Sequence, residues 1–166
     1  DTIQRIFLNV LDSQGHGSEM LLAFTDSATI GFDRSYDGKK IIVDGNLGIY
    51  SLLQNEPYAI QGLPKQSTHT IPIGLITNYS GEFTMKLSNT NNLPAGTTLH
   101  LEDLDNNIMH DLNTSDYIIN LPQDTFDNSF LLHVGMLATD LQETTKDKYT
   151  VVYNKGERLY IEGLRN

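Results

Sequence analysis

The sequence predicts an all-β domain built as an antiparallel β-sandwich, and three observations support this prediction. Apolar and polar residues alternate with a period of two in several short runs, most regularly where Phe83, Met85 and Leu87 are separated by polar residues. Residues that favour turns recur roughly every 8–12 positions, a spacing typical of sandwiches and barrels. No run with helical periodicity extends over three turns. We therefore expect a jelly-roll-like sandwich or two abutting immunoglobulin-like halves.

In the first half of the chain, short apolar runs bounded by turn formers predict five strands. These strands are residues 5–11, 20–24, 41–43, 48–53 and 57–60. Side chains alternate across a strand, so Ile6, Leu8 and Val10 fall on one face of the first strand. The segment from Phe24 to Lys40 has no sustained period, and the apolar runs on both sides predict an ordered loop with anchored ends.

The second half of the chain predicts a strand at 69–75 and several after it. Because Pro72 has no N–H group, this strand is expected at a sheet edge or with Pro72 facing away from its neighbour. The later strands are predicted at residues 82–88, 97–102, 108–112, 117–121 and 130–134. Their alternation predicts one shared core. Its predicted members are Phe83, Met85, Leu87, Leu99, Leu101, Tyr117, Ile119, Phe130 and Leu132.

The polar segment near the end of the chain predicts a division into three parts. Residues 1–140 are expected to form the sandwich module, 141–148 a linker, and 149–166 a terminal hairpin. A lone two-stranded hairpin is marginally stable in water. The hairpin is therefore expected either to dock on the sandwich or to begin a further domain.

Composition excludes several classes of function. The 166 residues carry a formal net charge of −10 and include no cysteine. Negative charge without a basic stripe argues against nucleic-acid binding. The lack of cysteine excludes a disulfide framework, a thiolate nucleophile and a thiolate metal site. No apolar run approaches the roughly 20 residues of a membrane-spanning helix, so membrane insertion is not expected.

Three aspartates in the long loop form a candidate calcium site. Ca²⁺ takes roughly six to eight oxygen ligands, and Asp26, Asp33 and Asp37 can supply carboxylate oxygens beside backbone carbonyls. Their spacing is not that of an EF-hand. The alternative is that these carboxylates cap turns through backbone N–H groups, or pair with Arg34 or Lys39. Calcium is thus the one candidate cofactor.

Aromatic residues in and beside the loops have two predicted roles. Ordering a long loop costs entropy, so Phe32 and Tyr36 are expected to turn inward and close one end of the sandwich. Tyr36, Tyr58 and Tyr79 are candidate stacking residues for sugar rings. Their alternative role is ordinary packing with the hydroxyl group in water.

No catalytic residue is predicted. The histidines lack the spacing of a zinc site, and no serine lies in a Gly-x-Ser-x-Gly context. Four acidic residues near one hairpin can in principle supply a carboxylate pair for glycoside hydrolysis. They are Glu102, Asp103, Asp105 and Asp111. A solvated hairpin whose charges prevent edge pairing is the favoured interpretation.

Several motifs together point to a known kind of module. They are Ala28-Thr29-x-Gly31-Phe32-Asp33-x-x-Tyr36-Asp37-x-Lys39-Lys40, then 49–51 and 59–64, and later 71–75, 101–103, 111–113, Tyr117 and 127–133. This pattern resembles a non-catalytic module found near the C-terminus of large secreted and cell-surface proteins of Bacteroidetes. That module usually has an arginine where Asn128 or Ser129 stands here. The tail, 149–163, is similar to the first hairpin of a type IX secretion sorting domain.

The resemblance implies export across the outer membrane and a position between a functional region and a sorting signal. The expected function is a non-enzymatic accessory module of a secreted or cell-surface multidomain protein. Its expected partners are the neighbouring domains and, through the sorting domain, the secretion machinery. The alternative is a carbohydrate-binding or adhesin module with an extracellular glycan as its ligand.

Overall fold

The structure, a computed structural model, describes residues 2–43, 45–136, 150–155 and 158–163, and these residues form strands and loops without a helix. The all-β prediction is therefore confirmed. The strands are β1 Gln4–Asp12, β2 Gly17–Phe24, β3 Gly38–Lys39, β4 Gly48–Leu53, β5 Glu56–Leu63, β6 Thr68–Ile76, β7 Gly81–Asn91, β8 Thr98–Asp103, β9 Ile108–Asp111, β10 Tyr117–Leu121, β11 Thr125–Gly135, β12 Thr150–Lys155 and β13 Arg158–Gly163.

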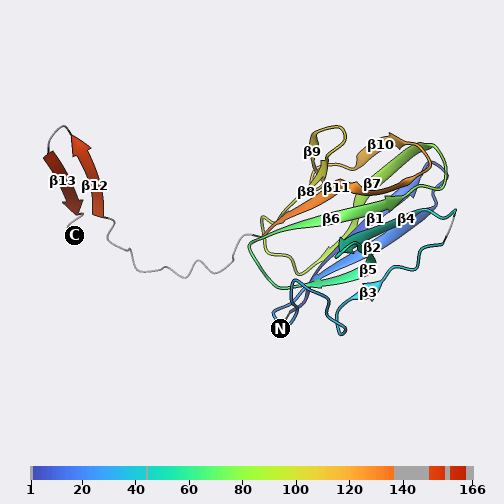
Figure 1. Cartoon of the computed structure of the whole chain (residues 1–166), viewed down its shortest axis with the longest axis horizontal. Coiled ribbons are helices and arrows are strands. Elements are labelled where there is room, and N and C mark those ends of the chain that lie inside the picture. Colours follow the sequence, from blue (N-terminus) through green and yellow to red (C-terminus); the bar gives the residue numbers. More distant parts are fainter. Residues whose placement is uncertain (1, 44, 137–149, 156–157, 164–166) are drawn as a thin grey trace.

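Eleven of these strands form one continuous sheet (Figure 1). Its order is β10-β7-β1-β2-β5-β4-β6-β11-β8-β9, with β3 paired to β5 beside this path. All recorded pairs are antiparallel except β2 with β5. The two ends of the path, β9 and β10, follow each other in the chain, and the sheet nearly closes into a barrel. Division of this sheet into the two layers of a sandwich stays a prediction.

The period-two pattern of the sequence corresponds to alternating burial in the strands. In β1, Ile6, Leu8 and Val10 are fully buried while the residues between them are partly exposed. The predicted core is largely confirmed, because eight of its nine members are buried. Leu87 is the exception: it is partly exposed and packs against the edge of the core. Burial of such large apolar side chains is the main favourable term in folding.

A buried polar contact joins β10, at one end of the sheet, to β8, which lies next to the strand at the other end. The hydroxyl group of Tyr117 in β10 donates to Oδ2 of Asp103 in β8 at 2.6 Å, and both residues are buried. Asp103 also accepts hydrogen bonds from the backbone N and the side-chain Nδ2 of Asn106. Burial raises the pKa of Asp103, but these hydrogen bonds outweigh burial and hold the pKa below its ordinary value. Burial and the bond to Asp103 together raise the pKa of Tyr117.

One strand prediction is wrong, and one of the two alternatives for the strand containing Pro72 is excluded. The predicted strand 41–43 is wrong: Ile41, Ile42 and Val43 join no ladder and are 83%, 41% and 53% exposed. The pairing with β5 is made instead by Gly38 and Lys39 of β3. The strand containing Pro72 is not a sheet edge, because β6 lies between β4 and β11. The register with β4 stops at Ile73, so the imino nitrogen of proline interrupts no recorded pairing with β4.

Chain entry and exit lie at the same end of the large sheet (Figure 1). Asn92, just after β7, donates from Nδ2 to the carbonyl oxygen of Ile3. At the exit, Gly135 pairs with Thr98, the first residue of β8. The connection between β7 and β8 therefore runs from the point of entry to the point of exit.

Two paired strands lie within residues 149–166, where a terminal hairpin is predicted. β12 and β13 pair in antiparallel register from Thr150 with Gly163 to Lys155 with Arg158. The predicted linker, 141–148, lies outside the described residues, and the boundary of the first module at residue 140 stays a prediction.

Leu99→Ala tests the core. Leu99 is 1% exposed and belongs to the central apolar cluster, so this truncation should reduce the free energy of unfolding by about 2–5 kcal/mol. Ile118→Ala is the matched control, because Ile118 is 58% exposed and its truncation should change stability by roughly 0.5 kcal/mol or less. Chemical denaturation measures both values. Equal effects of the two substitutions would contradict the burial pattern.

Candidate functional site

The long loop between β2 and β3 is held by its own aspartates. Asp37 accepts a hydrogen bond at Oδ2 from the backbone N of Asp33 at 2.6 Å. Asp33 accepts one at Oδ2 from the backbone N of Thr29, and its carbonyl oxygen accepts from the backbone N of Tyr36 and of Asp37. Carboxylates that accept backbone N–H groups in this way stabilise turns. The loop is therefore a chain of linked turns.

One hydrogen bond ties this loop to the sheet. Oδ1 of Asp37 accepts from the backbone N of Gly62 in β5 at 2.7 Å. A Cβ atom on residue 62 would lie 2.4 Å from Cβ of Tyr36 and 3.6 Å from that of Ala28. Only glycine permits this approach. We call the arrangement of Ala28, Tyr36, Asp37 and Gly62 the loop lock.

The calcium prediction stays untested, although the geometry favours the alternative role of the aspartates. Both carboxylate oxygens of Asp37 and one of Asp33 accept backbone hydrogen bonds. Asp26 forms an ion pair with Lys65 at 3.1 Å. Within the part of the chain that the structure describes, no group of three or more histidine or acidic residues is arranged to hold a metal ion.

The prediction that Phe32 turns inward is wrong. Phe32 is 54% exposed, and its ring lies against Tyr58 with centroids 6.1 Å apart. The hydrogen bonds of the aspartates supply the order that an inward phenylalanine was expected to provide. Tyr36 is half-buried against Gly62, as part of the loop lock.

The three candidate stacking residues lie in different environments. Tyr58, in β5, is only 4% exposed. Tyr36 packs on the sheet through the loop lock. Tyr79 lies between β6 and β7, where its ring contacts Phe83 with centroids 5.3 Å apart. A stacking role for these residues stays a prediction, and a ligand would meet Tyr36 and Tyr79 more readily than Tyr58.

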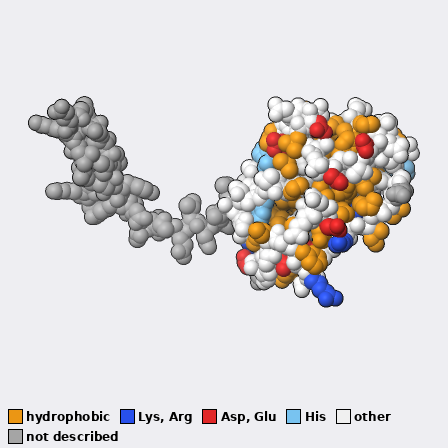
Figure 2. All heavy atoms as spheres, viewed as in Figure 1, with side chains coloured by type: hydrophobic (Ala, Val, Ile, Leu, Met, Phe, Trp, Pro, Cys, Tyr) orange, Lys and Arg blue, Asp and Glu red, His pale blue; other side chains and the backbone are white. Residues whose placement is uncertain are grey.

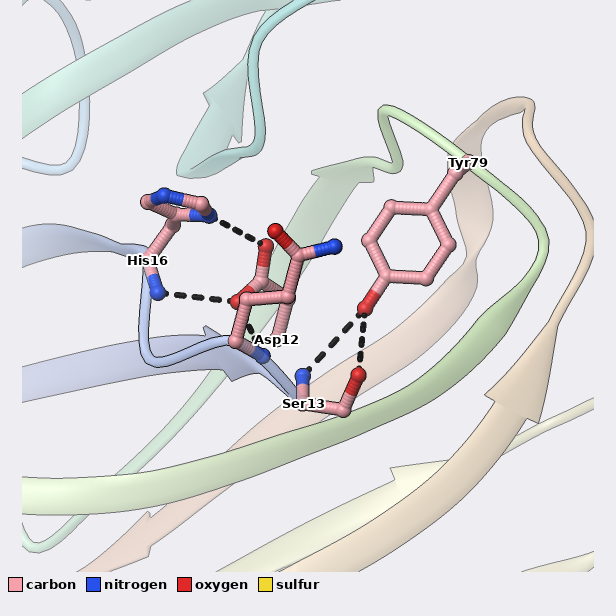
Figure 3. Close-up of polar contacts among 5 residues, drawn as sticks. Asp12, Ser13, His16 and Tyr79 are labelled. Atoms are coloured by element: carbon pink, nitrogen blue, oxygen red, sulfur yellow. Dashed lines mark hydrogen bonds and ion pairs between the residues drawn. The ribbon is translucent and has the colours of Figure 1, made fainter.

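A polar cluster at the turn between β1 and β2 was not predicted from the sequence (Figure 3). The side chain of Asp12 is fully buried, and its Oδ1 accepts from the backbone N of Gln14 and of His16. Its Oδ2 lies 3.0 Å from Nδ1 of His16, whose side chain is 67% exposed. The neighbouring Ser13 contacts the hydroxyl group of Tyr79 through its backbone N at 3.2 Å and its Oγ at 3.0 Å.

This cluster contains an oriented histidine but lacks the relay of a serine hydrolase. An aspartate that holds Nδ1 of a histidine is the orienting half of a Ser-His-Asp arrangement. Among the contacts of the described residues, Oγ of Ser13 pairs with Tyr79 and has no hydrogen bond to His16. Burial raises the pKa of Asp12, but the hydrogen bonds from His16 and Gln14 outweigh burial and lower the pKa. The cluster therefore fixes the turn and joins it to the loop after β6.

Three of the four acidic residues near the β8–β9 hairpin have separate partners, and the fourth, Asp105, is exposed. Glu102 contacts Nε2 of His133 at 2.7 Å, on the outside of the sheet. Asp103 belongs to the buried contact with Tyr117. Asp111 accepts from the backbone N of Asn113. Each of these carboxylates has its own partner, which is the pattern of structural contacts.

A second tyrosine–aspartate contact, which the sequence did not predict, links β4 to β11. The hydroxyl group of Tyr50 in β4 donates to Oδ1 of Asp127 in β11 at 2.6 Å. The ring of Tyr50 lies over Gly74 of β6, where an added Cβ would be 2.0 Å from Cε2 of the ring. Burial, followed by the bond to Asp127, raises the pKa of Tyr50.

The spacing Asp12-x-x-x-His16 could have suggested a capped turn, whereas no local signal joins Tyr50 to Asp127, 77 positions away.

These features define an all-β domain in which buried and half-buried polar contacts hold loops to a single wrapped sheet. A family model matches residues 1–134, and the chain belongs to that family, which is described as a domain of unknown function, DUF8693. A search of curated proteins and a search of solved structures each found no match. None of the described residues forms a helix that is long and apolar enough to cross a membrane.

Asp12→Asn tests the role of the buried carboxylate. Because the folded-state pKa of Asp12 is lowered, its ionised form stabilises the fold at pH values above the ordinary pKa of 3.8. That stabilisation is lost as the pH falls through the folded-state value. Between about pH 5 and pH 2, the melting temperature of the wild type should therefore fall more steeply than that of the variant. Asp116→Asn, at an exposed position, is the control and should keep the wild-type slope.

Asp37→Ala tests the loop lock. The substitution removes two hydrogen bonds to a carboxylate, which should lower the free energy of unfolding by about 1.5–3 kcal/mol. The amide of Gly62 should also exchange faster with solvent. Asp26→Ala removes an exposed ion pair and should cost at most about 1 kcal/mol.

The same two variants separate the loop lock from a calcium site. We expect a melting temperature that does not respond to calcium or to a chelator. A calcium-dependent rise that Asp37→Ala abolishes would instead establish the metal, because a ligand of the folded state stabilises it by mass action.

Proposed function

We propose that this domain is a non-enzymatic accessory module of a secreted or cell-surface multidomain protein, placed before a secretion sorting signal. The observation that carries this proposal is the loop lock. The motifs at 28–40 and 59–64 are the most specific part of the sequence, and they meet at Asp37 and Gly62. Their contacts are a backbone hydrogen bond and close packing, which maintain architecture. The residues of these two motifs thus act in folding, as expected of a module that supports other domains.

The ends of the module support the same proposal. Entry and exit at one end suit a domain that is carried beside a longer chain. The hairpin of β12 and β13 follows in the sequence and resembles the opening of a type IX sorting domain. The two-layer sandwich belongs to this proposal as well, supported by the antiparallel pairing of nearly all strands.

A second candidate function is binding of an extracellular glycan, as a carbohydrate-binding or adhesin module. The observation in its favour is an exposed apolar surface in the long loop, where Ile30 is 71% and Phe32 is 54% exposed. Hydrophobic side chains also reach the surface across the face of the domain shown in Figure 2. Exposed aromatic rings can stack on sugars. Binding on a glycan panel that Phe32→Ala abolishes would favour this candidate.

Surface labelling of cells that produce the natural full-length protein tests the first proposal. Antibodies raised against residues 2–136 should label intact cells, and protease added outside the cells should remove the label. A cytoplasmic protein serves as the control and should be labelled only after the cells are permeabilised. Labelling of this domain only after permeabilisation would contradict the proposal.

A further inference from the structure

The large sheet has one open stretch, along the second half of β7. β10 pairs with β7 only from Gly81 to Met85, whereas β7 continues to Asn91. On the other side of the opening, β9 begins its pairing with β8 at His100. Residues 86–91 of β7 therefore have β1 on one side and no strand of the described residues on the other.

A cleft of about 540 Å³ lies along this opening. Its apolar lining comes from Leu87, Leu93, Leu99 and Leu112, and Thr90 stands on its polar rim. On the opposite wall of the cleft, the backbone groups of Leu99 in β8 already have hydrogen-bond partners. The backbone N of Leu99 donates to Oδ1 of Asn113 at 2.7 Å, and its carbonyl oxygen accepts from the backbone N of Leu112 at 2.9 Å. The unpaired edge beside the cleft is thus the edge of β7.

This edge has one of the usual protections, a bulge, and lacks the others. Natural proteins blunt exposed edges with proline, with several charged residues or with bulges that turn the edge away. Residues 86–91 read Lys-Leu-Ser-Asn-Thr-Asn, with one charge and no proline. β7 itself has a bulge here, because Phe7 pairs with Asn89 and Leu8 with Leu87, which leaves Ser88 as the extra residue. An extended segment can still add to this edge by backbone hydrogen bonds and cover the leucines.

The terminal hairpin is the segment best placed to do so. The last described residues of the domain leave beside the cleft, because Gly135 pairs with Thr98 and the adjacent Thr97 lines the cleft. The 13 residues at 137–149 can span up to about 45 Å when extended, whereas the open edge is roughly 20 Å long. β12 and β13 pair only with each other, so within the described residues each has an outer edge with no neighbouring strand.

Charge also allows this contact. Residues 1–136 contain 16 acidic and six basic residues, and 137–166 contain five of each. The domain thus carries the whole net charge of −10, while the tail is neutral and meets no overall repulsion from it. A second copy of the domain would bring the same negative charge to the interface. Charge therefore favours the chain's own hairpin over another copy of the domain.

We propose that the β12–β13 hairpin adds one of its edge strands to residues 86–91 of β7 and covers the leucine-lined cleft. The inference rests on the proposed function in one respect, namely that the hairpin opens the domain that follows. The junction between the two domains is then a continuous strand ladder. Pairing with β7 also adds neighbouring strands to the hairpin, and three or more strands are more stable than two.

Paramagnetic labelling of the full 166-residue chain tests the contact. The chain has no cysteine, so Thr90→Cys places a single nitroxide at the rim of the cleft. Gln14→Cys places the matched label in the turn at the opposite end of β1. The label at residue 90 should broaden amide signals within 150–163, and the label at residue 14 should leave them sharp. Unchanged signals of residues 4–135 in the reduced form verify folding.

Two results would overturn the proposal. One is sharp signals of 150–163 with both labels. The other is broadening that appears only when labelled chains are mixed with unlabelled isotope-enriched chains, which would assign the cleft to a second copy. Surface labelling of cells is independent of this measurement. If the domain is exposed on cells but the strand contact is absent, only the docking is rejected. If the strand contact is present but the domain is not exposed, only the proposed function is rejected.

Discussion

The fold depends on closing one long sheet around one apolar core. Eleven strands wrap until β9 and β10, which follow each other in the chain, come near to meeting. A sheet that wraps in this way has two edge strands, and the bond from Tyr117 to Asp103 joins one of them, β10, to β8, which lies beside the other, β9. A buried carboxylate is costly unless its oxygens are occupied, and here Asn106 and Tyr117 occupy them. Closing the sheet therefore buries the apolar core and the Asp103 carboxylate together, and the carboxylate must have hydrogen-bond partners for the sheet to close.

Similar contacts hold the loops to this frame. Asp37 joins the long loop to β5, Asp12 fixes the turn after β1, and Tyr50 links β4 to Asp127 of β11. In each case an aspartate receives hydrogen bonds from backbone N–H groups or from a tyrosine. Glycine accompanies two of the contacts, since Gly62 admits Tyr36 and Gly74 admits the ring of Tyr50. The acidic composition thus contributes internal structure as well as charge.

Local patterns predicted much of this fold, because strand burial has a period that a sequence displays. Phe83 and Leu99 are buried as their alternation predicts. The strand predicted at 41–43 is wrong because high β-propensity alone does not provide a neighbouring strand to pair with. The predicted inward position of Phe32 is wrong for a different reason. Its loop is ordered by the contact of Asp37 with Gly62, which lie 25 positions apart in the sequence. Contacts between distant residues, including Tyr79 with Ser13, leave no periodic trace in the sequence.

The shared end of entry and exit has a mechanical consequence. A domain tethered at opposite ends of two strands is loaded along those strands, so that many hydrogen bonds must break together. Here the attachment points are the start of β1 and the end of β11, at one end of the sheet. Tension between them acts across the strands and separates hydrogen bonds one after another. Such a domain yields at a lower force than one pulled in shear.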